Sequence, residues 1–414
     1  MNYWINQFAV APDQPGGTRH IEMSAELIRQ GVPVTLVASD LNLNRRRYLR
    51  RNGAADRRWL RETIGDVPFV WLPAGSYESN DWRRALSMVI FAMHVLLFLM
   101  RAPRSRNTVF IGSTPHLLAA AATWAAARSR RVPFVLEVRD LWPESMVGVS
   151  GGGGGPLVPV LRLLSDRLYR SADSIIVLAE PNIDRLVQRG ADRSRIAYIP
   201  NGVDVTSFED ADLEACQVNI DKSTAAFAYT GAHGPANGLD LVLDAAKSLQ
   251  DRDETGVRVV LVGDGAVKQQ LVARARSLGL TNVDFVDPIP KSEIPGLLSR
   301  CHGALMVLAN VEVFHYGVSP NKLFDYLTAQ VPVVANVPGE ISRIVVESGG
   351  GEVVPPDDPG ALADAIVKVA GAPLCRTGSR EWIREHHDRR ALVSRLRESM
   401  DTARSRRRPS KVAA

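Results

Sequence analysis

The sequence predicts an α/β protein made of two Rossmann-like, doubly wound domains, and three observations support this prediction. Short apolar runs rich in Val, Ile and Ala, typical of strands buried in parallel sheets, alternate with amphipathic helical segments. This alternation runs once before and once after an irregular join at residues 203–219. The 414 residues are 45% hydrophobic and 23% charged, which suits two or three globular domains.

The expected elements follow one another along the chain. The first strand lies in YWINQFAVA at residues 3–11, and the amphipathic segment at 19–31 supplies the first helix. The other strands of the first half are expected in VPVTLVAS (32–39), NTVFIGS (107–113), VPFVLEVRD (132–140), SIIVLAE (174–180) and RIAYIP (195–200). Those of the second half are expected in FAYTGAH (227–233), VRVVLVGDG (257–265), VDFVDP (283–288), GALMVLAN (303–310) and VPVVANV (331–337).

A sharply bounded helix begins in SPNKLFDY. Ser319 is a favoured N-cap residue and Pro320 suits the first helical position, while Pro332 starts the next strand. The free amides at such a helix start bind anions, and Lys322 adds a full positive charge. We therefore expect this helix start to bind a phosphate.

Cysteine and histidine usage argues against disulfide and metal chemistry. Cys216, Cys301 and Cys375 are far apart and lack metal-ligand spacing, so we expect reduced thiols in a cytosolic protein. The eight histidines form no HExxH motif, and no Gly-x-Ser-x-Gly elbow is present. The DxD pairs at 210–212 and 251–253 are interpreted as solvated acids. No metal or other cofactor is expected.

Positive charge is unevenly distributed. The net charge is +5, yet residues 45–61 hold eight arginines against the single Asp56, and the tail at 405–414 is basic and expected to be disordered. No helix-turn-helix or aromatic RNA-binding motif accompanies these arginines, so no nucleic acid partner is expected. The N-terminal apolar stretch has no basic leader, which favours a strand over a secretory signal.

One apolar helix, at about residues 82–106, is expected to contact a membrane. Its core at 85–100 reads ALSMVIFAMHVLLFLM and is flanked by arginines. As a helix this core is about 24 Å long, short of the roughly 30 Å hydrocarbon thickness of a bilayer. Peripheral contact with an anionic membrane is therefore favoured over spanning, and a buried core helix is the alternative.

Three loops in the first half carry candidate site residues. In APDQPGGTRH, Gly16 and Gly17 allow close approach of a ligand just before Arg19, and these three residues are expected to bind the donor nucleotide or its phosphates. The lack of GxGxxG argues against a dinucleotide oxidoreductase. GSTPHLLAA contains His116, which is either a site residue or a histidine packed at a helix start. FVLEVRDLWPES ends a strand with a cluster that either binds hydroxyls and phosphates or forms a structural ion pair. This cluster consists of Glu137, Arg139 and Asp140.

The second half adds two glycine-rich loops. TGAHGPANG at 230–238 contains His233 and Gly234, and LVGDG contains Gly263. We expect these three residues to bind the donor nucleotide or its phosphates. In parallel sheets, ligands bind beyond the carboxyl ends of the strands, where these loops lie. The five glycines at 151–155 are expected to form a mobile loop beside the cleft, or a plain surface insertion.

Taken in order, PGG after the first strand, PNGVD at 200–204, LVGDG at 261–265 and SPNKLFDYLTAQVPVV at 319–334 resemble the retaining glycosyltransferases of family 4. That family has the GT-B fold, two Rossmann-like domains facing across a cleft. The resemblance covers roughly residues 3–387. EVRDLWPES, TGAHGPANGLD and YGVSPNKLFDY are similar to a subgroup that builds bacterial surface polysaccharides from N-acetylated amino sugars, such as the fucosaminyltransferases of O-antigen and capsule assembly.

The resemblance implies an acceptor-binding domain at residues 1–203 and a nucleotide-sugar-binding domain at 204–385. A terminal helix at 386–404 would pack back on the first domain. The implied reaction moves a sugar, most often from UDP, to a glycan growing on a polyprenyl diphosphate. The enzyme would then be cytoplasmic and peripheral to the inner face of the cell membrane.

The resemblance also suggests roles for individual residues. The family often has an acid eight residues before Asp325, where this chain has Gly317, and an Arg and a Lys where this chain has Ala232 and Asn237. A histidine frequent in the family falls on Arg139. Diphosphate binding is therefore assigned to the side chains of Lys322 and Arg139 and to the helix start formed by Ser319, Pro320, Asn321 and Lys322. Ribose binding is assigned to Asp325. Glu137, Asp140 and His116 are supporting catalytic candidates.

Two other functions stay open at this point. A sugar-nucleotide epimerase or hydrolase shares the two-domain architecture, although it has no use for an apolar, arginine-flanked helix. A catalytically silent GT-B scaffold would fit the missing acid at Gly317 and the presence of Ala232.

Overall fold

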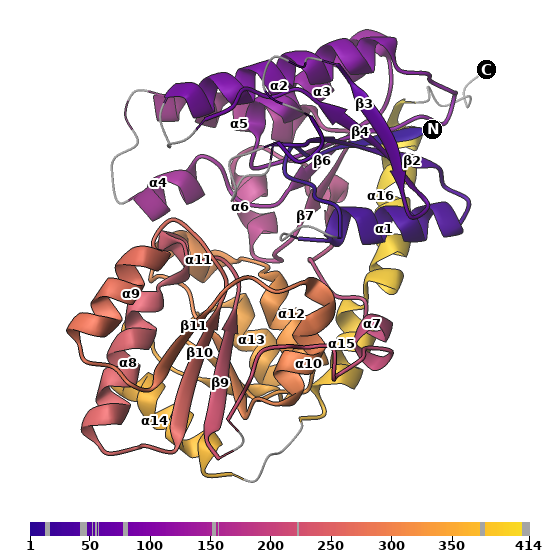
Figure 1. Cartoon of the computed structure of the whole chain (residues 1–414). Helices are drawn as coiled ribbons and strands as arrows, with labels where there is room; N and C mark the ends of the chain where they lie inside the picture. The colour runs from indigo at the N-terminus through magenta and orange to yellow at the C-terminus, as the bar shows by residue number, and fades with distance from the viewer. Residues whose placement is uncertain are drawn as a thin grey trace. The chain divides into compact units, whose positions relative to one another are not determined.

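The computed structural model describes residues 1–12, 17–41, 48–51, 53, 56, 58–77, 82–150, 155, 157–221, 223–372 and 377–407. The chain forms two compact units, Met1–Pro200 with Arg389–Ala414 and Asn201–Asp388 (Figure 1). It therefore passes between the units after residues 200 and 388, where the sequence predicts 203 and 385.

The first unit is built on an eight-stranded sheet of order β3-β4-β2-β1-β5-β6-β7-β8. Its neighbouring strands run parallel, except that β3 and β4 form an antiparallel pair that the sequence did not predict. The strands are β1 (Asn2–Ile5), β2 (Val34–Ser39), β3 (Leu60–Ile64), β4 (Val67–Leu72), β5 (Phe110–Ser113), β6 (Phe134–Val138), β7 (Ser174–Val177) and β8 (Ile196–Tyr198).

Helices cover this sheet, and the last helix of the chain belongs to the same unit. Its apolar side chains, such as Leu392, Leu396 and Met400, are buried in a core that also contains Trp4 and Ile111. The helices are α1 (Arg19–Arg29), α2 (Trp82–Arg101), α3 (Leu117–Arg130), α4 (Glu144–Ser150), α5 (Leu157–Ser171), α6 (Asn182–Gln188) and α16 (Arg389–Arg407), with the 3₁₀ turn η1 (Arg193–Arg195).

The prediction that the disordered tail begins at residue 405 is wrong for residues 405–407, which are helical. Helix α16 continues to Arg407, whose Nε lies 3.0 Å from a carboxylate oxygen of Asp173. This ion pair fastens the last turn of the helix to the residue before β7. Residues 408–414 lie outside the described part of the chain, as do Gly16, Cys375 and residues 151–154.

The second unit has a six-stranded sheet of order β11-β10-β9-β12-β13-β14 in which all neighbours are parallel. The strands are β9 (Ala225–Thr230), β10 (Val257–Val262), β11 (Val283–Val286), β12 (Gly303–Met306), β13 (Val333–Ala335) and β14 (Gly351–Val353). The helices are α7 (Thr206–Glu209), η2 (Pro235–Asn237), α8 (Leu239–Asp251), α9 (Lys268–Ser277), η3 (Lys291–Glu293), α10 (Ile294–Ser299), α11 (Glu312–Tyr316), α12 (Asn321–Thr328), α13 (Glu340–Glu347), α14 (Pro359–Ala370) and α15 (Ser379–His387).

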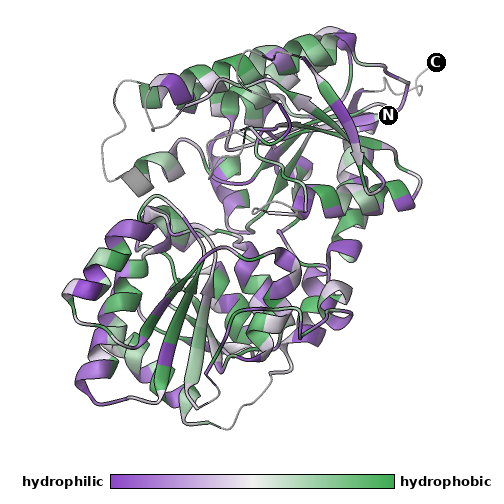
Figure 2. Cartoon of the chain, viewed as in Figure 1, coloured by the Kyte–Doolittle hydropathy of each residue, from purple (hydrophilic) through white to green (hydrophobic). Residues whose placement is uncertain are grey.

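The predicted class of two Rossmann-like α/β domains is confirmed. Val, Ile and Ala side chains of the strands face helices on both sides of each sheet, which gives the second unit one core cluster on either face. Figure 2 shows these strands as mostly hydrophobic, whereas the helices also carry hydrophilic residues. Cys216 and Cys301 are buried free thiols.

Candidate active site

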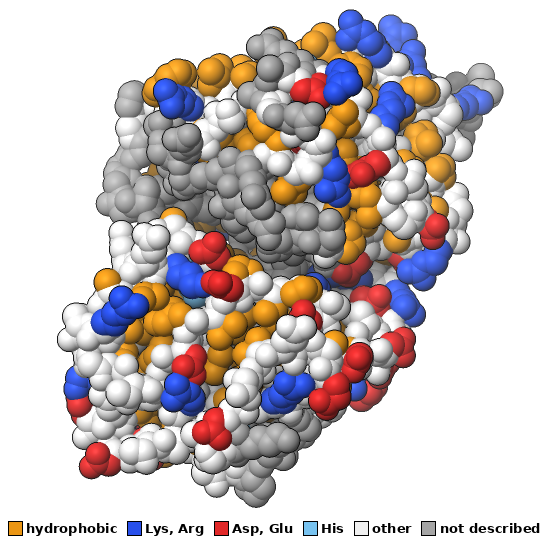
Figure 3. Space-filling view, viewed as in Figure 1, with side chains coloured by type: hydrophobic (Ala, Val, Ile, Leu, Met, Phe, Trp, Pro, Cys, Tyr) orange, Lys and Arg blue, Asp and Glu red, His pale blue; other side chains and the backbone are white. Residues whose placement is uncertain are grey.

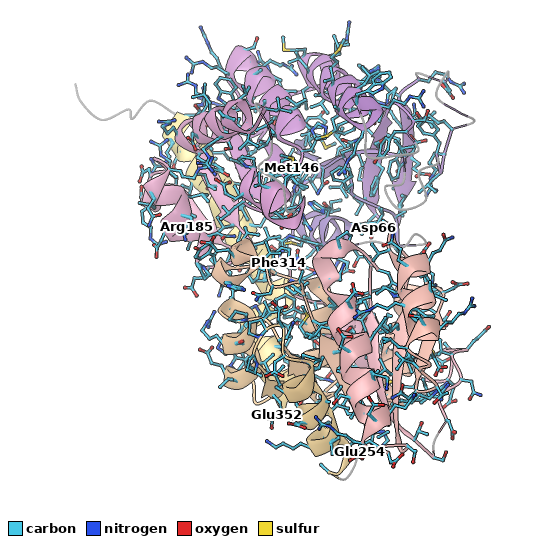
Figure 4. All side chains as sticks on the ribbon, turned by 90° about the vertical axis from the view of Figure 1, so that its left-hand side faces the viewer. Asp66, Met146, Arg185, Glu254, Phe314 and Glu352 are labelled. Carbon is cyan, nitrogen blue, oxygen red and sulfur yellow. The ribbon has the colours of Figure 1, made fainter. Side chains whose placement is uncertain are left out.

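The strand order of the second unit locates a binding edge. In an open parallel sheet, ligands bind beyond the carboxyl ends of the strands at the point where the strand order reverses. Here the order reverses between β9 and β12. In Figure 4, Phe314 on α11, which follows β12, lies at this end of the unit, and Glu254, which precedes β10, lies at the other.

The start of α12 belongs to this edge and differs in detail from the prediction. The N-cap residue is Pro320, not Ser319, and no side chain caps the helix. Ser319 does not cap because its Oγ accepts the backbone N–H of Asn201 over 3.0 Å. The helix proper begins at Asn321, so the amides of Asn321 and Lys322 have no side-chain cap and are suited to an anion.

Lys322 is the principal cation at this edge. Its Nζ lies 3.9 Å from the centroid of the Tyr229 ring and 3.2 Å from Oδ1 of Asn237. None of the described carboxylates forms an ion pair with it. Burial lowers the pKa of Lys322 to about 7. A lysine that is largely desolvated and has no acidic partner is suited to an anionic ligand that supplies the missing charge.

The two predicted glycine loops pack directly on each other. A Cβ atom on Gly263 would lie 1.8 Å from the carbonyl oxygen of Gly231, and one on Gly265 would lie 2.4 Å from that of His233. The N–H of His233 donates to the carbonyl of Asp264 over 2.8 Å. Contact between the two loops therefore requires glycine at positions 263 and 265.

His233 and Gly234 were predicted to bind phosphate. The His233 ring is fully buried and packs against Tyr229 and Phe285, with centroids 6.0 and 6.3 Å away. Burial, with the nearby charge of Lys268, lowers its pKa to about 4. The side chain therefore supports the loop from beneath and is neutral at pH 7, so a direct phosphate contact by His233 is not supported. Gly234 precedes η2 in extended conformation.

Asp325, the predicted ribose ligand, is paired with a residue that the sequence reasoning missed. Both carboxylate oxygens lie 2.6 Å from Nζ of Lys291, and Asp325 is 6% exposed. Lys291 follows the loop after β11, so it reaches Asp325 across the carboxyl edge of the sheet. The ion pair fixes the carboxylate and offsets its charge, and the lone pairs that remain can accept ribose hydroxyls.

In the first unit, Glu137 is a buried anchor and not an accessible catalytic group. It lies within β6 and is fully buried. Its carboxylate accepts hydrogen bonds from Arg19 Nε at 3.1 Å and Ser113 Oγ at 2.5 Å, and it also contacts Nε2 of His20 at 3.0 Å and Nε1 of Trp4 at 3.3 Å. Although burial favours the neutral acid, the neighbouring His20 and Arg19 hold the pKa of Glu137 well below its usual range.

Arg19 is likewise committed to structure, contrary to its predicted role at the donor. It is 1% exposed and donates to Glu137 and to the carbonyls of Ile199, at 3.0 Å, and Pro200. Arg19 therefore fastens the end of the first unit's chain to β6. Gly17, just before α1, is exposed, and its backbone is open to a ligand.

Arg139 and Asp140 follow β6, at the carboxyl edge of the first sheet. The N–H of Arg139 donates to Thr114 Oγ1 over 2.8 Å, and its Nη1 is buried without a hydrogen-bond partner among the described residues. Burial raises the pKa of Asp140. These two residues thus keep polar groups at the strand end, and the ligand-binding role expected of the cluster stays a prediction.

His116 packs at a helix start, which is one of the two roles considered for it. Its Nδ1 accepts the N–H of Ala119 over 2.7 Å, so the side chain caps α3, and its ring packs on Phe91 at a centroid distance of 5.7 Å. Burial lowers the pKa of His116 to about 4. A buried, neutral capping histidine is positioned for structure, not for proton transfer.

Three residues at the second-unit edge were not predicted as site residues: Tyr229, Asn237 and Lys291. The sequence signal that could have identified them is their position, because all three lie near the end of a strand or in the segment that follows it. Their mutual contacts depend on sheet order, which the sequence does not display. No group of three or more His, Cys, Asp or Glu residues suited to a metal ion occurs in the described part of the chain.

Comparison with known proteins adds independent information. Residues 16–202 match the model of a glycosyl transferase 4-like domain, and residues 224–371 match that of the glycosyl transferases group 1. The chain is 24% identical over 360 residues to the colanic acid biosynthesis glycosyl transferase WcaI of Escherichia coli, covering 84% of each chain.

Two solved structures share the fold. Sucrose-phosphate synthase from Thermosynechococcus elongatus has a TM-score of 0.74 and 16% identity, covering 96% of this chain and 97% of that one. HepE of Anabaena in complex with UDP-glucose has a TM-score of 0.66 and 15% identity, covering 97% and 99%. These likenesses are to GT-B structures and concern the fold alone.

Proposed function

We propose that this GT-B glycosyltransferase of bacterial glycan biosynthesis is a retaining enzyme that uses a UDP-linked sugar. Its residues 16–202 match the glycosyl transferase 4-like domain and its residues 224–371 match the glycosyl transferases group 1. The observation that carries the donor proposal is the position of Lys322. It lies at the uncapped start of α12, beside the glycine turn at Gly231, and has no acidic partner among the described residues. A diphosphate supplies the charge that this lysine lacks.

The proposed chemistry centres on the leaving group. When the bond between the anomeric carbon and the diphosphate oxygen breaks, positive charge develops on the sugar and negative charge on UDP. Lys322 and the amides of Asn321 and Lys322 stabilise that negative charge, and each such donor is worth about 3 kcal/mol in comparable sites. Because these groups are held in place before reaction, they need no reorganisation during bond breaking.

The acceptor step is proposed to occur on the face that UDP leaves. The acceptor hydroxyl attacks the anomeric carbon, and its proton passes to the departing phosphate oxygen, so no protein nucleophile is required. Fully buried Glu137 is unsuited to nucleophilic attack. Arg139 and Asp140 are proposed to orient the sugars, because they are the polar groups that follow β6 at its carboxyl end.

The ribose is proposed to bind near Asp325, within the ion pair that Asp325 forms with Lys291. The choice of uracil as base is supported by the family resemblance and by the fold shared with HepE, whose structure was determined with UDP-glucose. The transferred sugar is proposed to be an N-acetylated amino sugar, on the similarity of EVRDLWPES and YGVSPNKLFDY to that subgroup.

The acceptor is proposed to be a glycan on a polyprenyl diphosphate, which places the enzyme at the cytoplasmic face of the cell membrane as a peripheral protein. WcaI, to which this chain is similar, is named for colanic acid biosynthesis, and this supports a role in surface polysaccharide assembly. No cofactor beyond the nucleotide sugar is proposed.

A nucleotide titration tests the proposal. Isothermal titration of the wild type with UDP and GDP should give heat with UDP, and Lys322→Ala should weaken UDP binding at least about tenfold while leaving the protein folded. Lys368→Ala is the matched control, because Lys368 lies on α14 and pairs with Glu352. Normal UDP affinity in Lys322→Ala would refute the site.

Product analysis separates the competing activities. Incubation with UDP-N-acetylhexosamines and an extracted polyprenyl-diphosphate glycan should yield a lengthened glycan with the anomeric configuration of the donor, read by NMR. Free sugar or an epimerised nucleotide sugar as the main product would indicate a hydrolase or epimerase. Absence of UDP binding would indicate a silent scaffold.

A further inference from the structure

The outward side of α2 is a continuous apolar stripe. Its exposed large side chains recur every three or four residues, which places them along one side of the helix. Exposed helix faces in water normally carry polar residues at this spacing, so the pattern calls for a partner. The members are Trp82, Leu86, Val89, Met93, Leu96, Leu97 and Met100, with exposed fractions from 36% to 68%.

The inward side of α2 is fixed to the unit. Phe98 packs edge-on against Tyr3 and Trp59, with ring centroids 5.7 and 5.5 Å away, and Phe91 packs against His116. Trp59 also donates its indole N–H to Nδ1 of His94, the polar interruption of the helix, over 3.1 Å.

These contacts indicate whether α2 crosses a membrane or lies on its surface. The helix has 20 residues, more than the sequence core suggested, and by length and composition alone it could span a bilayer. With a rise of about 1.5 Å per residue it measures about 30 Å. Spanning would strip Phe91 and Phe98 from their partners, whereas lying parallel to a surface keeps them packed.

The apolar surface extends beyond α2 to α5. Leu157, Val160 and Leu163 are each more than half exposed, and they recur every third residue along α5. Helix α3 packs against both α2 and α5 and so links them (Figure 1). Between residues 117 and 127, α3 contains no charged residue.

The surroundings of this surface are cationic. From residue 82 to residue 136 the sequence contains eight arginines and no aspartate or glutamate. Figure 3 shows hydrophobic side chains along the edge where α2 lies in Figure 1, with Lys or Arg side chains at either end of the row.

Several of these arginines gather at one end of the stripe. Arg130 donates to the carbonyl of Ala102 over 2.7 Å, and Arg104 donates to the carbonyl of Arg130, so the ends of α2 and α3 meet. Among the described residues, no carboxylate forms an ion pair with Arg101, Arg104 or Arg128.

This charge pattern selects the partner. A symmetric contact with a second copy would set one arginine-rich border against another, since a twofold interface uses the same patch on both sides. An acidic lipid surface instead places anionic headgroups beside the arginines and accepts the apolar stripe between them.

We propose that α2, α3 and α5 form a lipid-docking face, on which the stripe of α2 and the leucines of α5 enter the interface of an anionic bilayer while the arginines contact headgroups. This face is the surface that makes the peripheral membrane contact. Only its biological purpose depends on the proposed function, in which the acceptor is linked to a lipid. Binding itself follows from the surface and requires no nucleotide or sugar.

Vesicle binding tests this face without the reaction. The wild type should sediment with vesicles of phosphatidylglycerol and phosphatidylcholine in equal parts, and high salt should weaken binding. Trp82, which is 68% exposed at the start of α2, should be quenched by lipids brominated on their acyl chains, and Trp82→Phe should remove that quenching.

Matched variants define the surface. Met93→Glu and Leu163→Glu should each weaken vesicle binding about tenfold. Val346→Glu on α13 should leave it unchanged, although Val346 is as exposed as Leu163, at 66% against 68%. Equal binding to pure phosphatidylcholine, or loss of a dimer in Leu163→Glu measured by light scattering, would overturn the proposal. UDP titration of the same variants distinguishes this failure from failure of the donor site.

Discussion

The backbone N–H of Asn201 donates a hydrogen bond to Oγ of Ser319 over 3.0 Å, and the Asn201 side-chain amide donates to the Ser319 carbonyl. Asn201 is the first residue of the second unit, and Ser319 stands two residues before α12. The point at which the chain enters this unit is therefore fastened to the segment that sets the position of Lys322.

Replacing Ser319 by Ala should disturb this fastening. The buried Asn201 N–H loses its acceptor, which costs about 1 to 3 kcal/mol of unfolding free energy. Because α12 then has more freedom, we expect kcat to fall about tenfold, a size typical of small misplacements in active sites. Ser277→Ala, at an exposed serine that bonds within its own helix, is the control for both denaturant unfolding and turnover. Unchanged kinetics in a destabilised Ser319→Ala would contradict the positional role.

Glu137→Gln should act on stability more than on donor binding. The neutral amide leaves Arg19 buried without its counter-charge, and breaking a buried pair in this way costs about 3 to 5 kcal/mol. Chemical denaturation should therefore show a lower unfolding free energy, while titration with UDP should show unchanged affinity, since the donor residues lie in the other unit.

A different result would restore the catalytic interpretation of Glu137. If Glu137→Gln kept wild-type stability and lost turnover, the carboxylate would be acting in the reaction. Glu144→Gln serves as a comparison, because Glu144 is a partly exposed acid that pairs with Arg162 and Arg189.

Local sequence signals were sufficient for most of the strands but not for the site. Strands β9 and β10 were recognisable because both of their faces are largely buried, which leaves runs rich in Val, Ala and Leu. The pair β3 and β4 was missed because β3 is an edge strand whose alternate residues, Arg61 and Thr63, are exposed and polar. The sequence identified Lys322, whereas its neighbours Tyr229 and Asn237 lie some 85 or more positions earlier and meet it only through the sheet order.

The errors at single residues have the same physical origin. Ser319 has the local preference of an N-cap, yet its hydroxyl is taken by Asn201 from more than a hundred residues away. Glu137 appeared to end a strand in a polar cluster, but donors from α1, β1 and β5 converge on it and enclose it. Tertiary hydrogen bonds of this kind leave no pattern in the sequence near either partner.

His116→Asn should change how stability depends on pH. The unfolded histidine takes up a proton near pH 6.5, as free histidine does, whereas the folded one does so only near pH 4. Between these values the unfolded state binds more protons, so stability rises with pH and the histidine accounts for up to about 3 kcal/mol of that rise. Asparagine can still accept the Ala119 N–H as a helix cap. The unfolding free energy of the wild type relative to His116→Asn should therefore rise by up to about 3 kcal/mol from pH 4 to pH 6.5. A difference between the two proteins that does not change with pH would contradict the buried, neutral state.

Asp325→Asn tests the ribose assignment. If Asp325 accepts ribose hydroxyls, the wild type should bind UDP more tightly than 2′,3′-dideoxy-UDP by about tenfold, and the variant should lose most of that preference. Lys291→Ala examines the ion pair separately, because it leaves the nearly buried carboxylate without its partner and should lower thermal stability. Retention of the full preference in Asp325→Asn would assign the ribose to another residue.

The affinity for UDP should fall as pH rises through neutrality, because the pKa of Lys322 in the free protein is about 7. Only the protonated lysine matches the diphosphate, so the apparent dissociation constant should increase about tenfold between pH 7 and pH 8.5, once the separate titration of the nucleotide phosphate near pH 6 is past. Lys322→Arg should bind UDP with little dependence on pH over this range, since a guanidinium stays charged. Isothermal titration in buffers of different ionisation enthalpy measures the proton taken up on binding, which should be present at pH 8 in the wild type and absent in Lys322→Arg. Equal pH dependence in the two proteins would show that another group controls donor binding.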